Sequence, residues 1–471
     1  MEADRRYPSR ARPRSSSIAA VLSFLWPGLG HGYVGRRRAA LLFAIPALLA
    51  VSALLLEAVG GIEQLAALLL TPSSALTVLI LILLLGLWRI IAIIDSAWAP
   101  RTRRTRLSAS LVIGLSAIVF ATHAWAGYVA WAFYDAGTRI FVADNSPDAS
   151  SGPGSFAPGA SDDPVDDYLA TPLATPETMT DRINILFTGM DTEATRQNEL
   201  TDSLLVISID PVTSDVAMIS FPRDISNFPL FDGRTYSGKI NSLMHWAKTH
   251  PKEFPDGAFP TLVKELGFLL GAPIHYYAAL DLAGFRKMID AVGGVTIDNK
   301  RQIADPRYDW MDGRRGFTLS PGKHKLDGEE ALAYVRSRYT PGDNDFNRAR
   351  RQQEVLLALR KKLTTPDMLL RIPELVEIAG DTIKTNFPPD RVNEMVALAT
   401  NVNNEDVRQV VLTRPYAERI PEAETGGIYK IRLVMSKLKQ LSVQIFGARS
   451  AYYDEVGPLP SGSSSAGPAS P

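Results

Sequence analysis

Apolar residues are concentrated in the first third of the chain, where three stretches are long enough to cross a membrane, which takes about 20 mostly apolar residues. These stretches are residues 39–56, 76–94 and 107–133. A fourth stretch, 18–34, is shorter and contains Pro27, Gly28 and Gly30 near its middle. Because proline and glycine interrupt a helix, this stretch predicts a re-entrant or interfacial hairpin. Region 18–134 is therefore expected to carry three spanning helices and one hairpin.

Basic residues flank the apolar stretches and set the expected orientation. Arginines occur in the arm 1–17, at 36–38 after the hairpin, and at 101–106 before the last stretch. Short loops rich in Lys and Arg stay in the cytoplasm, so the N-terminus is expected inside the cell and every residue after 133 outside. The run 27–38 also resembles the small two-helix TM2 membrane module, which implies a multi-pass anchor in the lipid bilayer and no chemistry.

The chain changes character twice after the last apolar stretch. Residues 135–180 are acidic, rich in Ser, Pro and Gly, and almost free of periodic apolar positions, and residues 448–471 look equally disordered. Such segments cannot bury enough apolar surface to fold. We therefore expect a disordered linker and a disordered tail, with one folded domain between them at 181–447.

Short apolar runs alternate with helical patterns inside this domain. Runs rich in β-branched residues predict buried strands at 183–187, 203–209 and 216–221. Apolar residues three and four positions apart predict helices at 261–270, 282–292 and 348–363. The expected fold class is α/β: a mixed central sheet flanked by helices, preceded by an α-helical transmembrane region.

Charge and composition narrow the function classes. The 471 residues include 50 basic and 50 acidic residues, six histidines and no cysteine. Zero net charge, and the lack of an aromatic platform beside the arginines, argue against nucleic-acid binding. The absence of cysteine excludes disulfides and thiolate chemistry, and no Ser-His-Asp arrangement or metal-binding His pair is visible in the sequence. An exported protease is therefore not expected.

Charged residues next to the predicted strands are the first candidates for chemistry, because open α/β sheets bind ligands beyond the carboxyl ends of their strands. Asp191 follows the first strand, Asp202 opens the second, and Arg223 follows the third. Two carboxylates together with substrate phosphates suit a hard divalent cation such as Mg²⁺. Taken singly, each residue also fits a helix cap or a solvated turn.

A denser group of arginines follows further along the chain. If the run 334–338 is a strand, Arg336 and Arg338 point to the same face, and if a helix begins at 345–352, Arg348 and Gln352 lie one turn apart on one side. Guanidinium groups bind phosphate oxygens in bidentate fashion and neutralise charge on a leaving phosphate. The group therefore predicts a polyanion clamp, with a solvated basic helix face as the alternative.

Seven sequence blocks resemble the LytR-CpsA-Psr family in order and spacing. They are GMD at 189–191, TDSLL at 201–205, SFPRD at 220–224, KIN at 239–241, DAVGGV at 290–295, LDGEEALAYVRSR at 326–338 and DFNRARRQ at 345–352. The resemblance is strong over 182–363 and weaker from there to about 447. It implies an extracytoplasmic phosphotransferase anchored in the cell membrane.

Enzymes of that family would move a glycopolymer from a polyprenyl-pyrophosphate carrier to a peptidoglycan sugar hydroxyl and form a phosphodiester. The partners implied are the lipid-linked glycopolymer, the peptidoglycan acceptor and the lipid bilayer, without nucleic acid. A polyprenyl-pyrophosphate-binding regulator and a pyrophosphatase of the cell envelope remain alternative functions.

The resemblance also implies roles for individual residues. Asp191 and Asp202 would hold Mg²⁺ or Mn²⁺, and Asp191 would serve as the general base. The pyrophosphate would be bound by Arg223, Arg336, Arg338, Arg348 and Gln352. The catalytic set would be Asp191, Asp202, Arg223 and Arg348.

Two further positions bear on the roles that the resemblance implies. Asp224 follows Arg223 and is expected to orient it through an ion pair. Family members commonly have an arginine two residues before the second aspartate, where this chain has Leu200. The chain would therefore lack one of the family's phosphate contacts.

Overall fold

The computed structural model describes residues 14–58, 68–141 apart from 101 and 104, 182–190, and 203–459 with short gaps. The gaps are 256, 311, 344, 364, 393, 396–397, 399–401 and 403–406. The chain divides into two compact units, 1–135 and 136–471, and each is described by itself. Most of the predicted linker, 142–180, lies outside the described residues, and so does the end of the predicted tail, 460–471.

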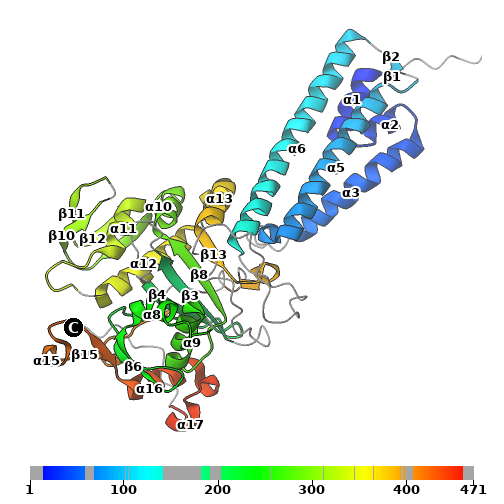
Figure 1. Ribbon diagram of the computed structural model, residues 1–471. Coiled ribbons are helices and arrows are strands. Elements are labelled where there is room, and N and C mark those ends of the chain that lie inside the picture. The colour runs from blue at the N-terminus through cyan, green and yellow to red at the C-terminus, as the bar shows by residue number, and fades with distance from the viewer. Residues whose placement is uncertain are drawn as a thin grey trace, which may run out of the picture. The chain divides into compact units, whose positions relative to one another are not determined.

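The first unit is helical (Figure 1). Its elements are β1 (Arg14–Ser15), α1 (Ser16–Leu25), α2 (Leu29–Tyr33), α3 (Arg37–Ala58), α5 (Pro72–Ala97), β2 (Thr102–Arg103) and α6 (Arg106–Ile140). Among the described residues, α5 and α6 are long and apolar enough to cross a membrane. Residues 39–56 lie in α3, and the third span and the topology remain predictions.

The predicted break in segment 18–34 is confirmed. α1 ends at Leu25, and Gly28 takes a φ of +98° before α2 begins. A Cβ atom at Gly28 would lie 2.3 Å from the carbonyl oxygen of Ala40. Glycine is therefore required at this turn, both for its backbone angle and for the close approach of α3.

The last helix of this region corrects the predicted start of the linker. α6 continues to Ile140, whereas the linker was expected from residue 135. Ala136 and Ile140 lie one turn apart and are both buried. They extend the apolar stripe of the helix by one turn, a spacing that is easy to miss before a Ser-rich and Pro-rich segment.

The second unit is built on a six-stranded mixed sheet. Its strands are β3 (Ile183–Met190), β4 (Ser203–Ile209), β5 (Val216–Phe221), β8 (Tyr276–Asp281), β13 (Ile383–Thr385) and β14 (Arg408–Val411), in the order β13-β8-β3-β4-β5-β14. β3 runs parallel to β8 and β5 parallel to β14, while β4 runs antiparallel to β3 and β5. The three predicted strands and the mixed sheet are confirmed.

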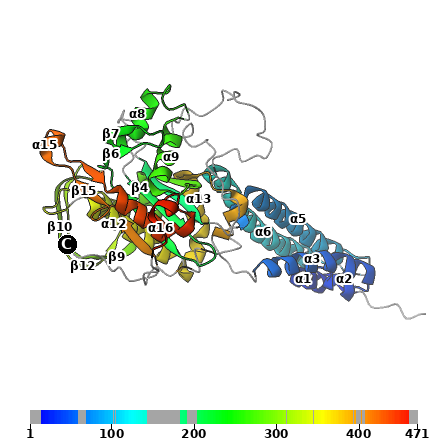
Figure 2. The ribbon, with the colours of Figure 1, turned by 90° about the horizontal axis from the view of Figure 1, so that it is seen from below.

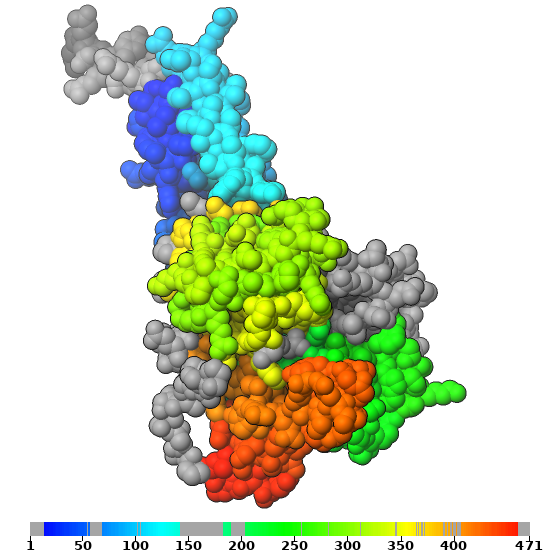
Figure 3. All heavy atoms as spheres, turned by 90° about the vertical axis from the view of Figure 1, so that its left-hand side faces the viewer, coloured from blue at the N-terminus to red at the C-terminus, as the bar shows by residue number. Residues whose placement is uncertain are grey.

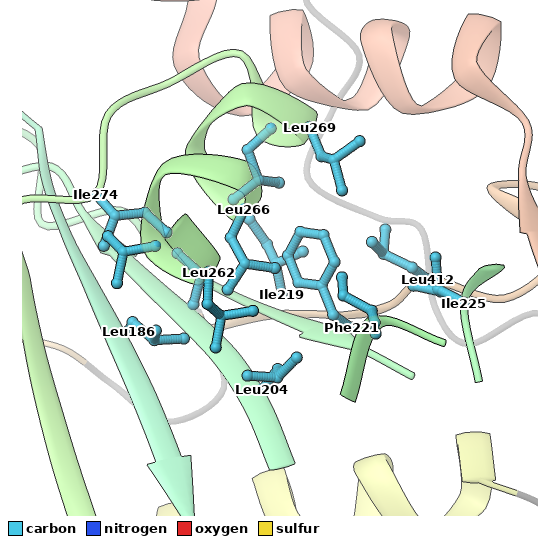
Figure 4. Close-up of a cluster of buried hydrophobic side chains, with 14 of the residues drawn as sticks. Leu186, Leu204, Ile219, Phe221, Ile225, Leu262, Leu266, Leu269, Ile274 and Leu412 are labelled. Carbon is cyan, nitrogen blue, oxygen red and sulfur yellow. The ribbon is translucent and has the colours of Figure 1, made fainter. Parts of the chain in front are cut away.

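Helices cover both faces of this sheet. Alternate residues of β4 separate the two layers: Leu204 and Val206 belong to one buried cluster, and Leu205 and Ile209 to the other. The first cluster includes residues of α8 (Leu243–Thr249), α9 (Ala258–Leu270) and α16 (Met435–Phe446). Figure 4 shows Leu262, Leu266 and Leu269 of α9 directed at the strands. The second cluster includes residues of α12 (Asp345–Leu363).

Further elements surround the sheet and build a second core. That core gathers residues of α10 (Leu282–Ala291), β9 (Val295–Asn299), β10 (Ile303–Asp309), β11 (Arg315–Leu319), β12 (Gly322–Leu326), α11 (Gly328–Arg336), η2 (Pro366–Arg371) and α13 (Ile372–Thr382). The predicted helices 261–270, 282–292 and 348–363 are thereby confirmed as α9, α10 and α12. Their C-terminal ends agree to within one residue, and α9 and α12 begin three residues before the predicted starts. In the space-filling view these yellow-green residues lie at the opposite end of the unit from the orange and red C-terminal residues (Figure 3).

Small hairpins and short turns complete the unit. They are β6 (Ser226–Pro229) with β7 (Thr235–Lys239), β15 (Ala417–Arg419) with β16 (Ile431–Leu433), and the short helices η1 (Ile240–Ser242), η3 (Pro389–Arg391), α15 (Glu422–Thr425), η5 (Gly447–Arg449) and α17 (Tyr453–Val456). Both ribbon views place the β6–β7 hairpin beside α8 and α9 (Figures 1 and 2).

The end of the folded unit lies beyond the predicted boundary at 447. The Tyr452 hydroxyl donates to the carbonyl oxygen of Phe268 at 2.5 Å, and the Ala451 N–H donates to that of Gly271 at 2.8 Å. Lys439 also ion-pairs with Glu455. The expectation of disorder from 448 was therefore wrong for residues 448–459, because their aromatic and charged side chains dock on α9 and α16.

Candidate functional site

The sheet register brings the strand ends named by the sequence to one edge. Gly189 pairs with Ser203, and Leu204 pairs with Phe221. The carboxyl ends of β3 and β5 therefore lie beside the first residues of β4. Asp191 and Asp202 belong to segment 191–202, which is outside the described residues, as is Leu200.

Arg223 lies just past the end of β5, on the way to the β6–β7 hairpin. Its carbonyl oxygen accepts a hydrogen bond from the Asn241 N–H at 3.4 Å, and its side chain is about one fifth exposed. The buried Asp224 carboxylate is 4.0 Å from Arg223 Nε, whereas it forms a close ion pair with Lys239. Asp224 therefore lies within ion-pair distance of Arg223, as expected, and it also pairs with Lys239, which the β6–β7 hairpin carries to it.

Arg336 and Arg338 are not on a strand, so the expected strand alternation is wrong at this point. Arg336 is the last residue of α11, and Arg338 lies in the loop that follows. α11 begins with a capping box, in which Asp327 accepts from the Glu330 N–H and the Glu330 side chain accepts from the Asp327 N–H. Such a box stabilises the first turn of a helix and outweighs the β-propensity of the short run that follows.

One buried carboxylate holds the loop that carries Arg338. Asp305 on β10 is 2% exposed. Its Oδ2 atom accepts the backbone N–H groups of Arg338 at 2.9 Å and Tyr339 at 3.2 Å, while Oδ1 accepts that of Arg307 at 3.0 Å. Charge-assisted hydrogen bonds to backbone donors are strong. The loop and the β10 strand are therefore fastened to each other.

The first half of α12 ties this loop to the sheet. Arg351 is buried, donates to the carbonyl oxygen of Ser337 and ion-pairs with Asp343 at 2.8 Å. Gln353 is also buried and donates to Ser220 Oγ at 2.8 Å and to the Val410 carbonyl oxygen at 3.1 Å. Arg351 of α12 thus contacts the loop after α11, and Gln353 contacts the ends of β5 and β14.

The predicted clamp residues that the structure describes therefore lie on α12 or on segments near it. Arg348 and Gln352 belong to the same turns of α12 as Arg351 and Gln353, as the sequence predicted, and Arg348 is buried. Arg223 follows Ser220 by three residues, and Arg338 follows Ser337 directly. The structure thus brings the segments that carry these arginines to the first half of α12, beside the carboxyl ends of β5 and β14.

Charge at this end of the sheet also affects a neighbouring tyrosine. Burial raises the pKa of Tyr308, and the positive charge of Arg336 opposes that rise. Within the described part of the chain, no group of three or more His, Asp or Glu side chains is arranged to hold a metal ion.

Sequence reasoning missed the residues that position the clamp. They are Lys239, Asp305, Arg351 and Gln353. Arg351 and Gln353 stood in the quoted block 345–352 or next to it, and their burial could have been inferred from the helical spacing. Asp305 carried no sequence signal for its role at the loop, because its partners there, Arg338 and Tyr339, lie more than 30 residues away.

Comparison with known proteins places this architecture in a family. Residues 159–444 match the family model LytR_cpsA_psr. The chain belongs to the LytR_cpsA_psr family.

Individual relatives carry two kinds of name. The chain is 29% identical over 228 residues to the polyisoprenyl-teichoic acid–peptidoglycan teichoic acid transferase TagU of Bacillus cereus, covering 48% of this chain and 68% of TagU. It is 31% identical over 216 residues to the transferase of the same description, TagV, of Bacillus subtilis, covering 46% of this chain and about half of TagV, 51%. It is 33% identical over 249 residues to the regulatory protein MsrR of Staphylococcus aureus, covering 52% of this chain and 68% of MsrR.

The crystal structure of B. subtilis TagV is a similar solved structure. It aligns with a TM-score of 0.45 and 23% identity, over 60% of this chain and 99% of that one.

Proposed function

We propose that this chain is a membrane-anchored extracytoplasmic phosphotransferase. It would move a glycopolymer from a polyprenyl-pyrophosphate carrier to a peptidoglycan sugar hydroxyl, forming a phosphodiester. Membership of the family and the names of the TagU and TagV relatives support this reaction. The single observation that supports it most is that Arg351 and Gln353 of α12 fasten the segments next to Arg338 and Arg223 to the helix that carries Arg348.

The proposed reaction requires the acceptor hydroxyl to be aligned with the phosphorus and the charge on the leaving phosphate to be neutralised. The acceptor hydroxyl would attack the sugar-proximal phosphorus, and the bond to the bridging oxygen would break, so that polyprenyl phosphate leaves with the electron pair. Arginines Arg223, Arg336, Arg338 and Arg348, with Gln352, would hold the pyrophosphate oxygens and offset the charge that develops on the leaving group. Asp191 would accept the proton of the attacking hydroxyl.

A divalent cation fits the donor chemistry at the start of β4. Gly189 pairs with Ser203, so the strands that flank segment 191–202 end side by side. Asp191 and Asp202 directly adjoin these strands, and carboxylate oxygens are the ligands that Mg²⁺ prefers in proteins. When bound there, Mg²⁺ or Mn²⁺ would neutralise phosphate charge.

A second candidate function is a regulator that binds polyprenyl pyrophosphates without transferring the saccharide. The name of the MsrR relative favours it, and so does Leu200 at a position where the family commonly has arginine. A clamp that lacks one phosphate contact would still bind the donor while stabilising the leaving group less.

One reconstitution assay separates these functions. The full chain in detergent is incubated with Mg²⁺ and a polyprenyl-pyrophosphate-linked saccharide, with and without peptidoglycan glycan, and polyprenyl phosphate release is followed. Release that requires the glycan, with the saccharide joined to it, is expected. Release without glycan would instead identify a pyrophosphatase, and binding without release would identify a regulator, in which Leu200→Arg is the first substitution to test for restored transfer.

A further inference from the structure

An exposed tyrosine beside the clamp carries two guanidinium groups against its ring. The Tyr339 side chain is 43% exposed. The guanidinium carbon of Arg307 lies 4.9 Å from the ring centroid, and that of Arg338 lies 5.0 Å from it. Arg338 also donates through Nη2 to the Tyr339 hydroxyl at 3.0 Å. Cation–π attraction of this kind holds each positive group at a defined place.

The three residues are fixed before any ligand arrives. Asp305 accepts the backbone N–H of every one of them, and the Ala304 N–H donates to Thr340 Oγ1 at 3.0 Å. The β10–β11 hairpin is itself stiffened by an aromatic group of Tyr308, Trp310 and Phe317, with ring centroids 5.4 to 6.0 Å apart. Binding here would cost little ordering entropy.

The guanidinium groups of these two arginines differ from their neighbours in their ion pairing. Other arginines of the same region are paired: Arg314 with Asp312, Arg315 with Asp309 and Arg351 with Asp343. Among the described residues, neither Arg307 nor Arg338 has a carboxylate within ion-pair distance. Two like charges against one ring repel each other, so a bound anion would stabilise the arrangement.

We propose that Arg307, Tyr339 and Arg338 form a second anion subsite, which binds a phosphate or carboxylate group on the saccharide part of the donor. The proposal rests on the proposed function, in which the donor is a lipid-linked glycopolymer. Arg338 is common to the clamp and the subsite, so the anion recognised would lie in the first sugars after the pyrophosphate. The subsite would favour acidic glycopolymers over neutral ones.

The test measures binding by the full chain in detergent, without any transfer step. The probes are a polyprenyl-pyrophosphate-linked disaccharide, the same compound bearing a glycerol phosphate group, and the same compound bearing a uronic acid carboxylate. The wild type is expected to bind at least one acidic probe about tenfold more tightly than the neutral one, as expected for hydrogen bonds to a charged group. The acidic probe that is preferred tells phosphate from carboxylate recognition.

Arg307→Gln should remove this preference while leaving the affinity for the neutral probe within about twofold. Arg315→Gln, on the same hairpin, is the matched control and should keep the preference. A wild type without preference, or an Arg307→Gln variant that keeps it or loses affinity for all probes equally, would overturn the proposal. A chain that shows the preference but transfers no saccharide would refute the proposed reaction and leave the subsite standing.

Discussion

Arg223 and Arg338 reach the same end of the sheet on segments that are held in different ways. Next to Arg223, the buried Asp224 is paired with another side chain, that of Lys239. Around Arg338, the buried Asp305 binds the backbone of the loop itself through three N–H groups. A side-chain ion pair leaves the backbone some freedom, whereas hydrogen bonds to the backbone fix its path. The segment at Arg223 has backbone hydrogen bonds as well, because the Asn241 N–H donates to the Arg223 carbonyl oxygen and the Ile431 N–H to that of Asp224. The two segments therefore differ in what the buried carboxylate binds, a side chain next to Arg223 and the backbone around Arg338.

Arg223→Ala is expected to have the largest effect. Loss of one donor aimed at developing charge typically costs about 10² to 10³ in rate. Glycopolymer transfer by the full chain should fall by this factor, while the thermal unfolding midpoint should stay near that of the wild type. Arg315→Ala is the control, because that arginine is 81% exposed and paired only across its hairpin. Normal transfer by Arg223→Ala would show that the clamp is wrongly assigned.

Asp305→Ala tests the fixed segment directly. It leaves three backbone N–H groups without their acceptor, which should lower the free energy of unfolding by about 3 kcal/mol and kcat/KM for the donor by about tenfold. Denaturant unfolding and transfer kinetics measure the two effects. Asp305→Asn retains one acceptor oxygen and should lose less of both. If Asp305→Ala transferred as fast as the wild type, the loop would not need its fixed path.

Lys239→Met tests the segment next to Arg223. Removal of the lysine leaves the Asp224 carboxylate buried without its closest partner, and the free energy of unfolding should fall by about 2 kcal/mol. The double variant Lys239→Met/Asp224→Asn should recover part of that loss, because the uncompensated charge is gone. Equal destabilisation in the single and double variants would mean that the pair itself contributes nothing.

Glu265 serves as a reference for the core outside the clamp. Its side chain is fully buried in α9, and Oε2 accepts the Phe231 N–H at 3.1 Å. Burial raises the pKa of Glu265 to about 8. The folded state therefore binds this proton more tightly than the unfolded state, whose carboxyl group has a pKa near 4.5. The contribution to stability is fully present below that value and is lost as pH rises to about 8.

The measurement for Glu265 is unfolding at several pH values. Between about pH 5 and 8, the free energy of unfolding of the wild type should fall by up to about 1.4 kcal/mol per pH unit from this group. Glu265→Gln should remove that slope. If the free energy of unfolding changed with pH in the same way in the wild type and in Glu265→Gln, the Glu265 carboxylate would be charged in the folded state.

The parts of the fold with short-range causes were accessible from the sequence. The apolar runs that became β3, β4 and β5 lie in the middle of a sheet covered on both faces, where every residue of a strand can be apolar. The spacing of Arg348 and Gln352 correctly placed both on one helix. The capping box at Asp327 was also readable in the sequence, and applying it would have kept Arg336 out of a strand.

The parts with long-range causes were not accessible. Asp305 looks like any turn aspartate until the loop at 338–339 is folded against it. Lys239 reaches Asp224 only because the β6–β7 hairpin returns to the end of β5. The clamp residues were thus recognisable as a group, while the residues that hold them depend on contacts between segments distant in the chain.

The docking of residues 448–459 has a practical consequence for protein production. A fragment that stops at Gly447 would lose the Tyr452 hydroxyl that binds the Phe268 carbonyl oxygen and the ring that lies against Gly271. The C-terminal end of α9 would then be exposed to solvent. The exposed apolar surface would favour proteolysis and self-association. Expression of the second unit alone should therefore include residue 459, and an affinity tag belongs after that point.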